Sequence, residues 1–147
     1  MAHYIFNVVR PGAATGTGLR EQVARSLRAR MWGIDVHEPH RDALAAGDLV
    51  LLYLGAPDRE FIGRAELASA VHDWTPSEAR VSVYPGDSPG GVSLAEVEEW
   101  DPSIPMSAVL SEIDPAENAK ADFQAGVVRI TANEYETALA VAARRAP

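Results

Sequence analysis

The 147-residue sequence contains no cysteine, which excludes disulfide bonds, thiol catalysis and cysteine-ligated metal sites. No apolar run approaches the roughly 18–20 residues that a membrane-spanning helix requires. The amino terminus lacks the basic start and the long apolar centre of a signal peptide. From these absences we expect a cytoplasmic protein that does not enter a membrane.

Lysine is almost absent as well, because Lys120 is the only one and the other basic residues are arginines. The formal net charge of −8 argues against a protein that coats nucleic-acid backbone, which requires a surplus of basic residues. The charge is unevenly distributed. Residues 1–64 hold eight arginines and seven acids, a net charge of +1, whereas residues 65–147 hold five bases and fourteen acids, a net charge of −9. A local basic patch is therefore possible only in the amino-terminal half.

The length and composition favour one globular domain over residues 1–147, since 47% of the residues are hydrophobic and 23% are charged. The most informative stretch is 46–68. Gly47-Asp48 is a turn signal, residues 49–53 form a short apolar run typical of a buried strand, and residues 61–67 follow as a second strand. Gly63 lies inside the second strand, where glycine usually marks a bulge or the close approach of another backbone.

Hydrophobic patterning places further elements on both sides of this hairpin. The stretch 131–144 opens with a capping box, Thr131 and Glu134, which predicts a helix. Purely alternating strand–helix units are absent, so we predict an α+β fold, a small mixed β-barrel with helices packed at its ends. The expected elements are a strand at 4–9, a helix at 19–30, an extended piece at 31–34, a helical turn at 41–46, a loop at 69–76, a strand at 80–84, a turn-rich stretch at 85–91, a strand at 92–100 ended by Asp101-Pro102, a short helix at 105–113 and a strand at 126–130.

Three stretches taken in order resemble the EVE domain, a member of the PUA-like superfamily that also includes the YTH and ASCH domains. They are Trp32-Gly33-Ile34 followed by the Leu44–Tyr53 segment, then the Phe61–Leu67 strand with His72-Asp73 and Thr75-Pro76, and finally 92–105 with the strand and helix from 127 onward. The sequence departs from the family pattern at Asp35-Val36-His37, where an Arg-Asn pair is usual, at Asp73-Trp74-Thr75, and at Leu54-Gly55.

The resemblance implies a non-catalytic domain that binds nucleic acid, with a base, often a modified one, inserted in an aromatic pocket. A flipped base can stack on an aromatic ring, and backbone or amide groups can read its edge. The resemblance implies Trp32 as the pocket tryptophan and Tyr53 as the aromatic facing it, although both types of residue also serve as ordinary core. The predicted ligand-binding residues are Trp32, Gly33, Tyr53, Asn7, His37 and Trp74, and no cofactor is expected.

Four arginines lie off the apolar stripe of the helix at 19–30. Either they form a solvated helix face or they form a basic rim beside the pocket that contacts phosphates. The predicted rim consists of Arg20, Arg25, Arg28 and Arg30. With the acidic carboxyl-terminal half, the expected ligand is a single-stranded nucleic acid or a modified nucleotide.

Two other functions remain open. Some ASCH relatives hydrolyse modified nucleosides with a Lys, a Thr and a Glu, but Lys120 lies in a polar connector far from the barrel motifs. A Ser-His-Asp set could draw on His37, His72 and Asp73, yet no nucleophile-elbow motif supports it. The third possibility is a protein-interaction module whose acidic half meets a basic partner.

A metal site at Asp35, His37, Glu38 and His40 fits no zinc spacing.

Overall fold

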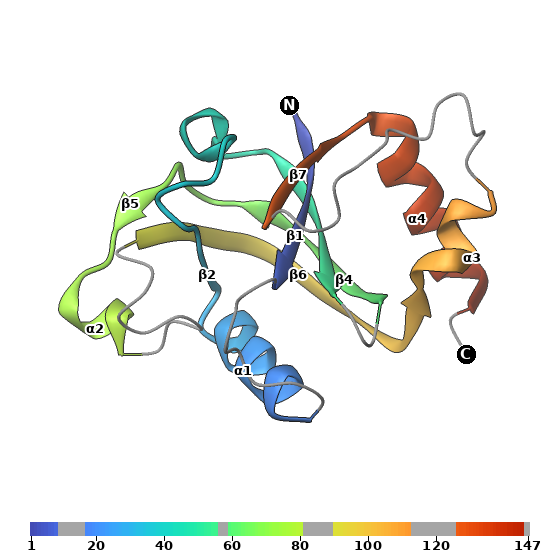
Figure 1. Ribbon diagram of the computed structural model, residues 1–147, viewed down its shortest axis with the longest axis horizontal. Helices are drawn as coiled ribbons and strands as arrows, with labels where there is room; N and C mark the ends of the chain where they lie inside the picture. The colour runs from blue at the N-terminus through green and yellow to red at the C-terminus, as the bar shows by residue number, and fades with distance from the viewer. Residues whose placement is uncertain (9–16, 56–58, 81–89, 113–125, 146–147) are drawn as a thin grey trace.

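The computed structural model describes residues 1–8, 17–55, 59–80, 90–112 and 126–145 (Figure 1). The chain forms a curled mixed β-sheet, a half-barrel, with helices packed against it, as predicted. The strands are β1 (His3–Val8), β2 (Met31–Gly33), β3 (Leu49–Leu54), β4 (Glu60–Leu67), β5 (His72–Asp73), β6 (Gly90–Pro105) and β7 (Val127–Ile130). The helices are α1 (Thr17–Arg28), α2 (Pro76–Ala79), α3 (Met106–Leu110) and α4 (Ala132–Arg145), with a 3₁₀ turn η1 (Arg41–Ala43).

The strand order is β2–β6–β4–β3–β1–β7, and β5 pairs with β6 beside this path. The central pair is the predicted hairpin of β3 and β4, which run antiparallel, while β1 runs parallel to β3. The turn before β3 follows the predicted chemistry, because Gly47 has a φ of 94° and the Asp48 carboxylate accepts hydrogen bonds from the Ala45 and Ala2 amides, each at 3.0 Å. This carboxylate therefore ties the start of the chain to the hairpin.

Gly63 shows both features that were predicted for it. The β3–β4 register shifts beside it, since Leu52 pairs with Gly63 but Tyr53 pairs with Phe61. On the other side the backbone of β6 approaches so closely that a Cβ at Gly63 would collide with the Glu98 carbonyl oxygen and lie 3.1 Å from the Glu99 Cα. Only glycine fits between these two strands.

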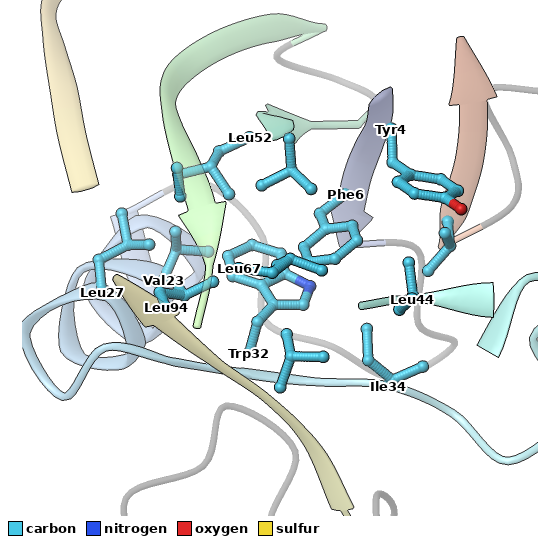
Figure 2. Close-up of a cluster of buried hydrophobic side chains, with 14 of the residues drawn as sticks. Tyr4, Phe6, Val23, Leu27, Trp32, Ile34, Leu44, Leu52, Leu67 and Leu94 are labelled. Atoms are coloured by element: carbon cyan, nitrogen blue, oxygen red, sulfur yellow. The ribbon is translucent and has the colours of Figure 1, made fainter. Parts of the chain in front are cut away.

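The sheet separates two buried clusters, because successive side chains of a strand point to opposite faces. Tyr4, Phe6 and Leu52 lie in one cluster, which α1 covers with Val23 and Leu27 (Figure 2). The other cluster, on the face that α4 covers, contains Ile5, Leu51, Tyr53, Phe61, Val128, Tyr135, Ala138 and Val141.

The predicted capping box of α4 is confirmed. The Glu134 amide donates to the Thr131 hydroxyl and the Thr131 amide donates to the Glu134 carboxylate, both at 3.0 Å. No helix in the described part of the chain is long and apolar enough to cross a membrane.

Three local predictions were wrong. The loop predicted at 69–76 contains β5 and the start of α2, and Gly90-Gly91, predicted as turn, begins β6. Asp101-Pro102 does not end the strand, since β6 continues to Pro105. Proline is tolerated there because the strand bulges away from its partner, so no ladder hydrogen bond is lost. The strand predicted at 80–84 lies mainly outside the described residues, as do the connection around Lys120 and most of the 11–18 loop.

Gly63→Ala should lower the free energy of unfolding by about 1–3 kcal/mol, because the added methyl group meets backbone that cannot move aside easily. Denaturant unfolding measures this change. Ala70→Ser adds one atom at an exposed position and is the control, with an expected change below about 0.5 kcal/mol. Equal stability of the two variants would contradict the close packing of β4 and β6.

Candidate ligand-binding site

Three strands meet at Gly90 and Gly91, the first residues of β6. On one side Gly33 of β2 pairs with Gly91, and on the other side His72 of β5 pairs with Gly91. The Ile34 amide donates to the Gly90 carbonyl at 3.1 Å. The pairing therefore brings the Trp32-Gly33 segment next to the His72–Trp74 segment, although some forty residues separate them in the sequence.

Gly91 is the contact point of Trp32 and Trp74. A Cβ at Gly91 would collide with the Trp32 carbonyl oxygen and would lie 2.6 and 2.7 Å from two atoms of the Trp74 six-membered ring. Because Gly91 has no side chain, the Trp74 ring can lie directly against the sheet backbone. Gly91 was predicted as the end of the turn-rich stretch 85–91, whereas it lies in β6. A glycine pair directly before an alternating strand was the signal that could have identified this close approach.

Trp74 is partly exposed, yet its indole Nε1 is buried and has no hydrogen-bond acceptor among the described residues. A buried donor without an acceptor is unfavourable by about 1–3 kcal/mol. The His72 ring packs edge-on against Trp74, with centroids 5.4 Å apart and an interplanar angle of 87°. Trp74 therefore combines an aromatic ring held at a fixed angle with an unused polar group.

A short helix supports this corner. In α2 the Glu78 amide donates to the Thr75 hydroxyl at 3.2 Å, and the Glu78 carboxylate accepts from the Thr75 amide at 3.0 Å. The other carboxylate oxygen of Glu78 lies 3.3 Å from His72 Nε2. The Thr75 amide, and then His72, lower the pKa of Glu78, so this carboxylate stays ionised and holds the His72 ring beside Trp74.

Trp32 belongs to the core on the α1 face. Its side chain is 2% exposed and stacks on Phe6, with centroids 5.9 Å apart at 29° (Figure 2). Leu44 and Ile34 belong to the same cluster. The Trp32 backbone, rather than its ring, lies against Gly91.

The structure does not bring Tyr53 or Asn7 to Trp32. Tyr53 is 2% exposed in the cluster on the α4 face, where its hydroxyl lies 3.3 Å from the Met106 sulfur. The expectation that Tyr53 faces Trp32 is therefore wrong, because the two side chains lie in separate clusters on opposite faces of the sheet. Asn7 is also buried, and its backbone amide donates to the Gly126 carbonyl at 2.8 Å. On the neighbouring strand it pairs in register with Tyr53.

His37 is exposed in the loop after β2, away from the core that holds the Trp32 ring. Its amide donates to the Asp35 carboxylate at 2.8 Å, which closes a local turn. The neighbouring Glu38 carboxylate accepts from the Gly126 and Val127 amides at 2.9 and 3.1 Å and so fastens this loop to β7. No group of three His, Asp or Glu residues in the described ranges could hold a metal ion.

Two of the four predicted rim arginines, Arg25 and Arg28, are exposed on α1, which packs against the core through Val23 and Leu27. Arg30 follows the helix with a φ of 57°, and its guanidinium donates to the Ala95 carbonyl of β6. The side chain of Arg20 is outside the described part of the structure.

A hydroxyl that lies close to His72 is that of Ser69, whose Oγ is 3.4 Å from His72 Nδ1. This hydroxyl donates to the Ala70 carbonyl at 2.9 Å and accepts from the Ser93 amide at 3.0 Å. With the Ala70 carbonyl as its acceptor, the hydroxyl does not donate to the imidazole in this arrangement. This geometry gives no support to Ser69 as a nucleophile activated by His72.

No protein-family model and no curated protein sequence match this chain. Solved structures do match over nearly its whole length. The YTH domain of Zygosaccharomyces rouxii MRB1, in complex with N6-methyladenosine RNA, has a TM-score of 0.66 at 13% identity, covering 99% of this chain and 88% of that chain. Human THYN1, in complex with 5-methylcytosine-containing DNA, has a TM-score of 0.62 at 14% identity, covering 97% and 98%.

A third structure, the protein Rpa0253 from Rhodopseudomonas palustris, covers 100% of this chain and 97% of that chain, with a TM-score of 0.60 at 16% identity. At such low identities the likeness shows the fold and not the ligand. The predicted resemblance to EVE and YTH-like domains is confirmed at that level. The chain therefore has the PUA-like fold that the YTH domains and THYN1 share.

Proposed function

We propose that this protein binds single-stranded nucleic acid and holds one base, of the methylated class, against Trp74 at the Gly91 end of β6. The observation that carries the proposal is the Trp74 side chain, whose buried Nε1 has no acceptor among the described residues and whose ring lies on the backbone at Gly91. The structural neighbours in complex with methylated RNA and methylated DNA support the same class of ligand.

The chemistry of Trp74 suits a base. Its ring offers a stacking surface, which contributes roughly 1–3 kcal/mol per base. The buried indole N–H supplies a donor for a ring nitrogen or a carbonyl oxygen on the base edge. Bound ligand would thus satisfy a group that the protein leaves without a partner among its described residues. A base flipped out of a single strand costs less to unstack than one taken from a duplex.

Charge favours a short single-stranded ligand. The exposed arginines Arg25 and Arg28 lie in the half of the sequence with net charge +1, whereas the half from residue 65 onward carries −9. A few phosphate contacts are consistent with this distribution, and a long duplex would be repelled by the acidic half. Tyr53 and Asn7 are buried, and His37 lies in the loop after β2. The proposal therefore assigns none of these three residues a contact with the base.

The proposal is tested by binding of fluorescently labelled single-stranded RNA and DNA that carry N6-methyladenosine or 5-methylcytosine, with unmodified oligonucleotides of equal length for comparison. Trp74→Ala should lower the affinity for the preferred oligonucleotide by roughly 1–3 kcal/mol, about 5- to 150-fold, because stacking is lost. Trp74→Phe keeps a ring without the N–H donor, so its affinity should lie between those of the unaltered protein and of Trp74→Ala.

Circular dichroism of the same variants controls for folding, since Trp74 is partly exposed and its removal should leave the sheet intact. Unchanged affinity of a folded Trp74→Ala variant would exclude this base site. Absence of binding to every oligonucleotide would reject nucleic-acid binding altogether.

Trp32→Ala should act on stability and not only on binding. Because the ring is 2% exposed and stacked on Phe6, its removal should lower the free energy of unfolding by about 3–5 kcal/mol. Thermal melting and oligonucleotide binding are measured on the same variant. A stable variant with lost affinity would instead make Trp32 a ligand residue, as the sequence resemblance implies.

Arg25→Ala combined with Arg28→Ala should weaken oligonucleotide binding about equally for all sequences and make it less dependent on salt, because phosphate contacts carry no sequence information. The matched control removes two other exposed arginines, Arg59 and Arg145. If both double variants bind like the unaltered protein, the α1 arginines form a solvated face.

A further inference from the structure

Strand β6 bulges strongly at its second half, far from Gly90 and Gly91. Gly63 of β4 pairs with Glu99, but Phe61 pairs with Ile104, so the single residue Ile62 lies opposite the four residues from Trp100 to Ser103. Bulges of this kind bend a strand and redirect its side chains, and they are common beside binding sites. We call this four-residue stretch the β6 bulge.

Hollows open on two sides of the β6 bulge. One, of about 550 Å³, is bounded by Val23 and Ala24 of α1, and the other, of about 380 Å³, is bounded by Leu139 and Ala142 of α4. The same four consecutive residues line both, namely Glu99, Trp100, Asp101 and Pro102. The bulge is thus a ridge with accessible space on either flank.

Trp100 is the aromatic residue of this ridge. It is partly buried against the cluster on the α4 face, and its Nε1 donates to the Glu98 carboxylate at 3.0 Å. The same carboxylate also accepts from Arg64 Nε at 3.1 Å. These contacts fix the indole while part of it lines the two hollows.

The charge around Trp100 is negative. Arg64 compensates Glu98, but Glu99 and Asp101 are exposed and form no ion pair with another side chain in the described ranges. Glu99 and Asp101, the sequence neighbours of Trp100, line the same two hollows as the indole. Their uncompensated carboxylates favour a cation, which the ring face also attracts. They disfavour a phosphate backbone, so a nucleic acid does not fit this surface.

We propose that the β6 bulge docks a short basic peptide of a protein partner, with a Lys or Arg side chain over the Trp100 ring and between the Glu99 and Asp101 carboxylates. The occupant follows from charge complementarity, from the aromatic ring and from the two flanking hollows of about 380 and 550 Å³, which offer space for neighbouring side chains of one peptide. This surface is at the opposite end of β6 from Trp74. A nucleic acid and a protein could therefore be bound together.

The test uses a fluorescein-labelled nine-residue peptide of alternating Lys/Arg and Gly, with a peptide of the same length in which Gln replaces every Lys and Arg. Binding is measured by fluorescence anisotropy at low and at physiological salt. Glu99→Gln combined with Asp101→Asn should weaken binding of the basic peptide about three- to tenfold without changing the fold, because both side chains are exposed. The Gln peptide should bind weakly to every variant.

The control variant, Asp42→Asn with Glu66→Gln, removes the same number of charges elsewhere and should keep the full affinity. Trp100→Leu keeps an apolar side chain against α4 but loses the ring, and should also weaken binding about three- to tenfold. If this variant unfolds, the carboxylate variant alone decides.

If Glu99→Gln/Asp101→Asn and Asp42→Asn/Glu66→Gln weaken binding of the basic peptide equally, the effect is one of net charge and the proposal is overturned. Unchanged binding to the Glu99→Gln/Asp101→Asn protein would overturn it as well. Concentration-dependent dimerisation that this variant abolishes, without peptide binding, would assign the surface to a second copy of the chain instead. Loss of oligonucleotide binding in the Trp74 variants would leave this result unaffected, so the two sites are tested separately.

Discussion

The close approach of backbones along β6 is the constraint on which the rest of the structure depends. At Gly90, Gly91 and Gly63 a side chain would collide with the carbonyl oxygen of His72, Trp32 and Glu98 respectively. These three contacts join β6 to β5, β2 and β4, and they allow one 16-residue strand to connect both ends of the half-barrel. Any side chain at these positions would separate strands whose pairing positions both candidate surfaces.

The two ends of β6 then differ in chemistry. At the glycine end no side chain stands between the strand and Trp74, so an aromatic ring with a buried N–H lies directly on the backbone. At the other end the bulge presents Trp100 among carboxylates. One end therefore suits a base and the other a cation.

Much of the fold could be predicted from the sequence because local signals and burial agree there. The Gly47-Asp48 turn, the alternating β4 strand and the Thr131–Glu134 capping box all carry their structure in adjacent residues. The bulge at Gly63 was also predictable. By contrast, Asp101-Pro102 looked like the end of a strand, since the long-range register that accommodates it is not encoded locally.

The candidate site was less predictable, for the same reason. Which face of the sheet Tyr53 occupies depends on the register of β3, and a family resemblance placed it opposite Trp32 although the two lie in separate clusters. The importance of Trp74 depends on Gly91, a residue seventeen positions later that contacts it only through the β5–β6 pairing. Contacts of this kind are invisible to periodicity and to short motifs.

The most direct test of the central claim follows the three indole N–H signals of the protein by ¹⁵N nuclear magnetic resonance, since the sequence holds only three tryptophans. During titration with a single-stranded oligonucleotide that carries one methylated base, we expect the Trp74 signal to shift strongly as its buried N–H gains an acceptor. The Trp100 signal should stay in place. Saturable binding that leaves the Trp74 signal unmoved would contradict the account.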